Sequence, residues 1–304
     1  MKNKRIKLSV VLATRNEETN IARCLASVKS IADEIIVFDE HSLDKTREIA
    51  RSFGAKVFET THNDNFHITK QKAIDKARGE WILQLDADEV VTPPLAGEIR
   101  EVVGSSNNEL LKRVLGHDTN RTSNTKKVSL FLRHQNLIEK REGHLGKESG
   151  EVVAFFVPRI NVFLGAPLVH AGVYPDGVIR LIKSGKAKLP AKSVHELMDI
   201  EGEVGWLFNN LEHYDSPTMR RYVWRMNRYT DLHARELMQK GISKNFFYFV
   251  LYSIFKPIYT FTNLFLRHKG FLDGPRGFLW SFFSAMHFPL AYYKYWSSDK
   301  DGKD

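Results

Sequence analysis

The 304-residue chain is poor in cysteine, because Cys24 is its only one. A single thiol excludes an intramolecular disulfide and any metal site built from several cysteines. It also fits a protein of a reducing compartment. The apolar run Leu8–Ala13 is too short for the hydrophobic region of a secretory signal, and charged residues follow it. We therefore expect no secretory signal.

Acidic residues are also in short supply, since 36 Asp and Glu stand against 45 Lys and Arg and the net charge is +9. An excess of this size predicts an anionic partner: a phosphorylated substrate, an anionic lipid or nucleic acid. Hydrophobic residues make up 42% of the chain, which excludes a disordered protein. The length allows one large domain or two modest ones.

The first hundred residues alternate between short apolar runs and segments with helical spacing. The runs predict strands at Leu8–Ala13, Glu34–Phe38, Lys56–Phe58 and Trp81–Leu85. The intervening and following segments predict helices at Glu17–Ser30, Leu43–Phe53, Ile68–Ala77 and Leu95–Val103. This order is typical of an α/β domain with a mostly parallel sheet that helices cover on both faces.

The character of the chain changes after residue 103. Residues 104–127 are polar and predict a loop insertion around a short helix at 109–115. Apolar runs then predict strands at 128–132, 152–157 and 178–182. From about residue 205 the sequence is helical and aromatic. We therefore expect one domain at 1–204 and a second region at 205–304.

The second region contains two long apolar stretches, Phe246–Leu266 and Phe278–Trp296. Arg and Lys flank them, and Tyr and Trp gather at 292–296, as anchors at a membrane interface do. We expect helices that lie in the interface. A buried helical layer and a membrane-spanning helix are the alternatives, although Lys256 and Pro257 interrupt the first stretch.

Polar residues follow three of the predicted strands, at 14–17, 39–44 and 86–89. Ligands of an open parallel sheet bind at these carboxyl ends. Asp86 and Asp88 are the sharpest signal, because carboxylates two residues apart on extended backbone point the same way. Together with substrate phosphates they suit one Mg²⁺ or Mn²⁺ ion. An acidic turn that caps the next helix is the alternative, but the position after a central strand favours a metal.

In this order and spacing, the motifs resemble the nucleotide-binding half of family 2 glycosyltransferases. The resemblance rests on Thr14-Arg15-Asn16-Glu17, on Asp39 with Ser42, and on the segment Gly79–Glu89. Later segments, at 170–176, 194–196 and 270–274, resemble the bacterial lipopolysaccharide core β-1,4-glucosyltransferase subgroup. The family implies a GT-A fold, which is Rossmann-like. It also implies inverting transfer of a sugar from a nucleoside-diphosphate sugar, expected to be UDP-linked.

The resemblance implies roles for individual residues. Those implied to bind the nucleotide sugar are Thr14, Asn16, Glu17, Asp39, Lys70 and Asp86. Those implied to hold Mg²⁺ or Mn²⁺ are Asp86 and Asp88. Glu196 is the candidate catalytic base, and His195 is its rival as base or as a further metal ligand. Asp176 and Arg180 shape the acceptor or donor pocket, or else form a structural ion pair.

The implied acceptor is a lipid-linked or other envelope glycan at the cytoplasmic face of the cell membrane, where the enzyme would be peripheral or monotopic. No nucleic-acid partner is expected from the family. Two other functions stay open. A nucleotidyltransferase would need a glycine-rich phosphate loop, which the segment 14–17 lacks. A non-enzymatic basic protein would bind nucleic acid or membrane without acidic strand ends. His170 and His213 match no catalytic pattern.

Overall fold

The computed structural model describes residues 6–63, 65–114, 125–143, 145–190 and 198–298. The chain forms two compact units. The first comprises Met1–Arg159 and Pro175–His213, and the second comprises Ile160–Tyr174 and Tyr214–Asp304. The main boundary thus falls after His213 and not at residue 204, because the strands that follow residue 202 belong to the sheet of the first unit.

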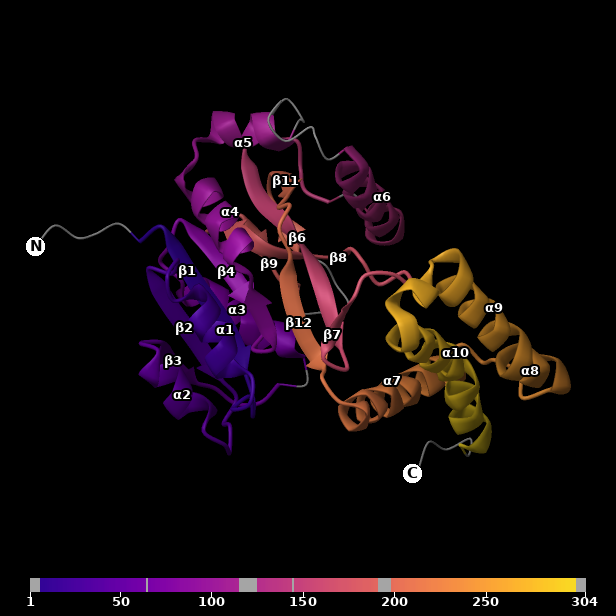
Figure 1. Cartoon of the computed structure of the whole chain (residues 1–304). Coiled ribbons are helices and arrows are strands. Elements are labelled where there is room, and N and C mark those ends of the chain that lie inside the picture. Colours follow the sequence, from indigo (N-terminus) through magenta and orange to yellow (C-terminus); the bar gives the residue numbers. More distant parts are fainter. Residues whose placement is uncertain (1–5, 64, 115–124, 144, 191–197, 299–304) are drawn as a thin grey trace, which may run out of the picture. The chain divides into compact units, whose positions relative to one another are not determined.

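Four parallel strands form the first half of the main sheet (Figure 1). They are β1 (Leu8–Thr14), β2 (Glu34–Asp39), β3 (Lys56–Glu59) and β4 (Trp81–Leu85), in the order β3-β2-β1-β4. All three pairings are parallel. The central strand β1 is buried along almost its whole length and mostly apolar, because helices cover both of its faces. The predicted α/β class is therefore confirmed.

Alternate residues of β1 enter different cores. Leu8, Val10 and Leu12 join the main cluster, to which three helices contribute buried side chains. These helices are α1 (Ile21–Val28), α2 (Thr46–Ser52) and α4 (Pro93–Gly104). On the other face, α3 (Phe66–Lys76) contacts β1 and β2. Helix α4 begins at Pro93, two residues before the expected start, because Thr92 accepts a hydrogen bond from the Leu95 amide and prolines suit the first helical turn.

The second half of the sheet turns back on the first. Its strands are β5 (Glu89–Val91), β6 (Val152–Phe163), β8 (Asp176–Lys183) and β12 (Leu211–Ser216), in the order β4-β8-β6-β12-β5. Strand β5 follows β4 after a short turn, yet it pairs at the far end of this series. The sheet is therefore curled, and the end of β4 lies near β12. Two short strands pair with β6 at its sides, β7 (Ala166–Leu168) and β11 (Glu203–Trp206). A separate small sheet joins β9 (Ala187–Lys188) and β10 (Asp199–Ile200).

The expectations about the middle of the chain have different outcomes. Within the insertion expected at 104–127, the short helix predicted at 109–115 is present as α5 (Asn107–Val114). The strand expected at 128–132 was wrong, because these residues belong to helix α6 (Thr125–Glu142). Tertiary packing accounts for the helix: Phe131 is buried, and the centre of its ring lies 4.6 Å from that of Trp206. Likewise β11 and β12 precede the C-terminal helices, which begin only at Met219.

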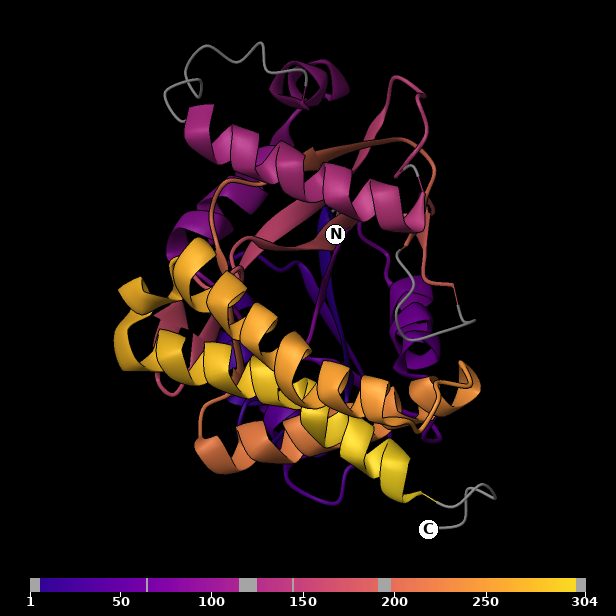
Figure 2. The same ribbon diagram turned by 90° about the vertical axis from the view of Figure 1, so that its right-hand side faces the viewer.

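The second unit contains a layer of helices (Figure 2). They are α7 (Met219–Gln239), α8 (Phe246–Val250), α9 (Lys256–Thr262) and α10 (Gly274–Ser297). Two π-helical segments and one 3₁₀ turn complete them: η2 (Leu251–Phe255), η3 (Asn263–Arg267) and η4 (Gly270–Asp273). Helix α10 packs against both α7 and α9. Among the described residues, one helix is long and apolar enough to cross a membrane by length and composition, Phe246–Arg267.

A buried carboxylate holds the edge of the parallel strands together. Glu34 accepts hydrogen bonds from Ser9 Oγ at 2.8 Å and Lys56 Nζ at 3.0 Å. Arg78 also donates to Glu34, through both its guanidinium group and its backbone amide. Burial alone would raise the pKa of Glu34, but the hydrogen bonds from Arg78, Lys56 and Ser9 outweigh it and lower the pKa to about 2.

The lowered pKa of Glu34 predicts acid sensitivity of folding. The carboxylate stabilises the fold above the ordinary value of 4.5, and this contribution is lost as the pH falls from there towards about 2. We expect Glu34→Gln to lower the free energy of unfolding by about 3 kcal/mol at pH 7. Urea unfolding from pH 7 to pH 2.5 measures it. The gap between variant and wild type should shrink with acid, and a constant gap would contradict this account.

Candidate functional site

The loops after β1 and β2 are joined by side chains that the sequence singled out. Thr14 Oγ1 donates to Asp39 Oδ2 at 3.0 Å, and the Ser42 amide and hydroxyl donate to the same carboxylate at 2.8 and 2.6 Å. The Asn16 amide in turn donates to Ser42 Oγ at 2.8 Å. Asp39 is fully buried. It therefore fixes the two loops against each other.

The same pair of loops is held in an unusual backbone shape. Asn16 has φ 55° and His41 has φ 51°, and residues other than glycine rarely adopt such values. The Asn16 side-chain oxygen accepts the Leu43 amide at 2.8 Å, and the Glu17 amide donates to Thr46 Oγ1 at 2.7 Å. Such strained backbone persists only where its surroundings hold it, and it is common at binding sites.

Two cations flank the first aspartate of the acidic turn after β4. Lys70 Nζ lies 2.5 Å from Asp86 Oδ1, and Arg180 Nη2 lies 2.6 Å from Asp86 Oδ2. Burial by itself would raise the pKa of Asp86, but the charges of Arg180 and Lys70 outweigh it and hold that pKa well below its usual range. Asp86 is therefore a carboxylate at neutral pH, and each of its oxygens faces a cation.

Glu89 holds both the acidic turn and Arg180 in place. It is fully buried, and its carboxylate accepts the Asp86 amide at 2.9 Å and Arg180 Nη2 at 2.6 Å. Arg159 Nη1 adds a third contact at 3.2 Å and uses its other nitrogens to bind Asp176 at 2.6 and 2.9 Å. Asp176 and Arg180 thus belong to one network but do not pair with each other. Asp176 pairs with Arg159, and Arg180 pairs with Asp86 and Glu89.

The second aspartate of the turn faces a histidine from another strand. Strands β5 and β12 pair so that His213 stands opposite Glu89, and His213 Nε2 lies 3.6 Å from Asp88 Oδ2. Burial would raise the pKa of Asp88, but the adjacent His213 ring outweighs it, and the pKa lies below its usual value. Sequence reasoning assigned His213 no role, because only the pairing of distant strands brings it here.

The predicted residues thus fall into two connected groups. The acidic-turn group joins Lys70, Asp86, Asp176 and Arg180, and has Asp88 in the same turn. The loop group joins Thr14, Asn16 and Asp39, with Glu17 in the same loop. Both candidate bases, His195 and Glu196, lie outside the described residues. Sequence reasoning passed over four residues of the site: Gln84, which accepts a hydrogen bond from Arg180 Nη1 at 2.6 Å, and Glu89, Arg159 and His213. Gln84 and Glu89 stood within a motif already noticed, Gly79–Glu89.

The donors near Asp88 suit a divalent cation that also binds a substrate. Across the described residues, no three His, Cys, Asp or Glu side chains form a metal site by themselves. Asp88 and His213 supply one carboxylate and one imidazole at short distance. Mg²⁺ and Mn²⁺ ions are commonly held by one or two carboxylates, with substrate phosphates and water filling the other positions. The turn therefore fits such an ion in the presence of a phosphorylated ligand.

Comparison with known proteins agrees with the motifs. Residues 9–145 match the model of a family described as glycosyl transferase family 2, which confirms the resemblance. An uncharacterized glycosyltransferase of Rickettsia conorii is 26% identical over 275 residues, 90% of this chain and 84% of that protein. The lipopolysaccharide core biosynthesis glycosyltransferase LpsC of Rhizobium meliloti is 24% identical over 294 residues, 92% of this chain and 91% of LpsC.

Other similarities are partial. The chain spans as little as 20% of the length of one curated relative. Glucosyl-3-phosphoglycerate synthase from Mycobacterium tuberculosis, solved with Mn²⁺, uridine-diphosphate and glucosyl-3-phosphoglycerate, is 25% identical. That likeness covers 33% of this chain and 39% of the synthase, with a TM-score of 0.28. A likeness so limited carries no conclusion about the ligands of this chain.

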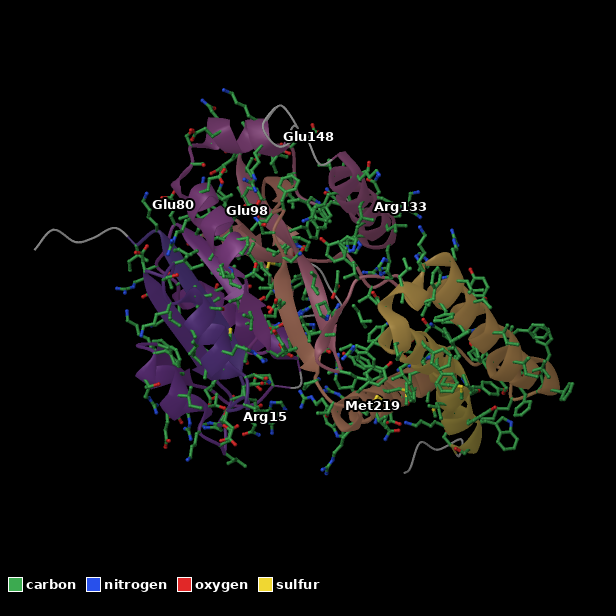
Figure 3. The ribbon with its side chains drawn as sticks, in the orientation of Figure 1. Arg15, Glu80, Glu98, Arg133, Glu148 and Met219 are labelled. Atoms are coloured by element: carbon green, nitrogen blue, oxygen red, sulfur yellow. The ribbon has the colours of Figure 1, made fainter. Side chains whose placement is uncertain are left out.

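The buried network predicts a large penalty for neutralising Glu89. We expect Glu89→Gln to lower the free energy of unfolding by about 3 kcal/mol, because Arg180 and Arg159 each lose one of their two carboxylate partners in a buried place. Urea unfolding at pH 7 measures the change. Glu148→Gln is the matched control, since Glu148 is exposed (Figure 3) and should cost less than about 0.5 kcal/mol. Equal costs for the two variants would show that the network is not a stabilising element.

Proposed function

We propose that this chain, whose residues 9–145 match the family 2 glycosyltransferases, moves a sugar from a UDP-sugar to an envelope glycan and inverts its anomeric carbon. The acidic turn after β4, with its two cations and with His213, is the observation that carries the proposal. It gathers in one place the charges that a departing nucleoside diphosphate requires. The acidic-turn group is therefore the donor-diphosphate site.

Lys70 and Arg180 neutralise the charge that grows on the leaving diphosphate. Both are buried beside Asp86, and positive charge in a site with little water acts more strongly than it does in bulk solvent. The diphosphate competes with Asp86 for the ion pair with Lys70, whereas Arg180 keeps its ion pair with Glu89. Arg180 thus stays in place while Lys70 shifts between the two anions.

Asp88 and His213, with Asp86 beside them, would hold Mg²⁺ or Mn²⁺ together with the donor phosphates. When bound, the ion supplies further positive charge at the diphosphate. The loop group supplies the nucleotide contacts: Thr14, Asn16 and Glu17, with Asp39 at the ribose or base.

The acceptor hydroxyl attacks the anomeric carbon from the face opposite the diphosphate. A base within hydrogen-bond reach takes its proton, and a single displacement inverts the configuration. We assign this role to Glu196, with His195 as the alternative. Similarity to LpsC, a lipopolysaccharide core biosynthesis glycosyltransferase, supports an envelope glycan, free or lipid-linked, as the acceptor. We place the enzyme at the cytoplasmic face of the membrane, as the family resemblance implies.

The two other functions fit the site less well. A nucleotidyltransferase binds its triphosphate on a glycine-rich loop, but the loop after β1 is built on Thr14, Asn16 and Glu17. A non-enzymatic basic protein has no use for a buried carboxylate such as Asp86 between two cations. Its binding would instead depend steeply on salt and not on metal.

Donor binding tests the proposal directly. UDP-, GDP-, ADP- and dTDP-sugars are titrated by calorimetry with Mn²⁺, Mg²⁺ or EDTA, using the full chain in detergent. We expect one UDP-sugar to bind with metal. Asp88→Asn and His213→Gln should weaken that binding by about 10- to 100-fold, since metal-site substitutions commonly cost this much. In EDTA both variants should match the wild type, because the metal-dependent part is absent there.

Glu148→Gln serves again as the control and should bind donor as the wild type does. Folding of each variant is checked by circular dichroism. If the folded wild type binds no sugar nucleotide with any metal, the proposal is wrong. Donor binding that is unchanged in Asp88→Asn would contradict the assigned metal site while leaving the transferase function standing.

A further inference from the structure

The helix Phe246–Arg267 of the second unit has its large apolar side chains on the outside. Its outer apolar face consists of Phe247, Ile254, Phe255, Ile258, Tyr259 and Leu266, which recur at helical spacing and are all exposed. Phe255 is 63% exposed, Ile258 59% and Tyr259 67%. Figure 3 shows carbon-rich side chains projecting along this helix. Exposed apolar patches of this kind mark surfaces that another phase or molecule covers.

The polar groups of the same helix are hidden or satisfied. Lys256, its charged residue before Arg267, points inward, with Nζ 3.5 Å from the centre of the buried Tyr252 ring and 5.6 Å from that of Phe288. Thr262 lies on the outer side but donates its hydroxyl to the Ile258 and Tyr259 carbonyls at 2.8 and 3.0 Å. Neither Lys256 nor Thr262 therefore needs water on the outer face, and the Tyr259 hydroxyl there suits the polar headgroup region. This arrangement reverses that of a surface helix in a soluble protein.

The charge of the surrounding chain is strongly one-sided. Between residues 237 and 298, seven Lys and Arg stand against one acidic residue, Asp273. Asp273 is buried and bonds the His170 ring at 2.8 Å, so it adds little negative charge to the surface. Arg267 and Lys269 are exposed where the helix ends. An apolar face with cations at its border complements a bilayer that contains anionic lipids.

The neighbouring helices limit how deeply the second unit can insert into a membrane. Helix α10 packs against both α7 and the Phe246–Arg267 helix, so these two flank it (Figure 2). Exposed charges lie on α7, at Arg220, Arg221, Arg228, Asp231, Arg235 and Glu236. Such a helix cannot enter the hydrocarbon core without great cost. One side of the unit thus suits lipid and another suits water, which favours a position in the interface and not across the membrane.

We propose that the outer apolar face inserts into the headgroup–acyl boundary of a membrane rich in anionic lipids. The helix lies along the membrane plane, and Arg267 and Lys269 contact the headgroups. Lys256 stays on the protein side and takes no part in lipid contact. The inference identifies the surface through which the proposed enzyme reaches an acceptor at the membrane. It rests on the second unit alone and does not require that the donor assignment be correct.

Co-sedimentation of the full chain with lipid vesicles, without donor or metal, tests this proposal. One set contains phosphatidylcholine alone, and the other contains about one third phosphatidylglycerol. We expect the wild type to bind the anionic vesicles. Phe255→Ser/Ile258→Ser/Tyr259→Ser should weaken binding at least about a hundredfold, because three large side chains no longer leave water. These residues are exposed, so the variant should fold.

Three matched variants separate the contributions of the apolar face, of Lys256 and of the cations at the helix end to vesicle binding. Leu132→Ser/Leu137→Ser removes exposed apolar residues of α6 and should leave vesicle binding unchanged. Lys256→Met should also leave it unchanged, because that cation faces inward. Arg267→Gln/Lys269→Gln should lose most of the preference for anionic vesicles, about tenfold or more. Donor binding in detergent should be the same in all of them, so that failure here and failure of the donor site are distinguishable.

The proposal is overturned if the folded wild type does not bind anionic vesicles, or if the triple variant binds them as the wild type does. It is also overturned if sedimentation equilibrium without vesicles shows a dimer that the triple variant abolishes. In that case a second copy of the chain covers the face.

Discussion

The site depends on one buried carboxylate, that of Glu89. It receives the backbone amide of Asp86 and the guanidinium groups of Arg180 and Arg159, and it is fully removed from water. A buried carboxylate is stable only when cations and hydrogen-bond donors replace the water that it has lost. Moving any of these partners away from Glu89 would therefore destabilise the fold, and this cost holds them in position. The turn that carries Asp86 and Asp88 is thereby held rigid before any ligand arrives, which lowers the cost of ordering it on binding.

The curled sheet explains why these groups meet. Strand β5 begins with Glu89 just past the acidic turn, yet it pairs with β12 and not with the neighbours of β4. That pairing sets His213 beside Asp88, while β8 and β6 deliver Arg180 and Arg159 from the strands between. The site therefore combines the turn between β4 and β5 with residues of β6, β8 and β12. The rigid sheet, and not one flexible loop, therefore defines the site.

Much of this was predictable from the sequence, for physical reasons. Buried parallel strands are continuous apolar runs, so β1, β2 and β4 were found, and Asp86 and Asp88 follow from their position after β4. Lys70 and Arg180, the two cations that contact Asp86, were among the residues that the sequence singled out. His213 beside Asp88 and Arg159 beside Glu89 were not predictable, since they come close only through antiparallel pairings of distant segments. Helix α6 was mistaken for a strand because a short apolar run has no clear period, and Phe131 packs in a way that the sequence does not reveal.

The central claim is that the acidic turn and His213 together bind a metal and the diphosphate of a donor. Anomalous scattering from crystals grown with UDP and Mn²⁺ tests it most directly. The account predicts one strong manganese peak between Asp88 Oδ2 and His213 Nε2, in contact with diphosphate oxygens, and Lys70 within hydrogen-bond distance of the same diphosphate. A manganese peak at another place, or UDP bound with its diphosphate away from this turn, would contradict it.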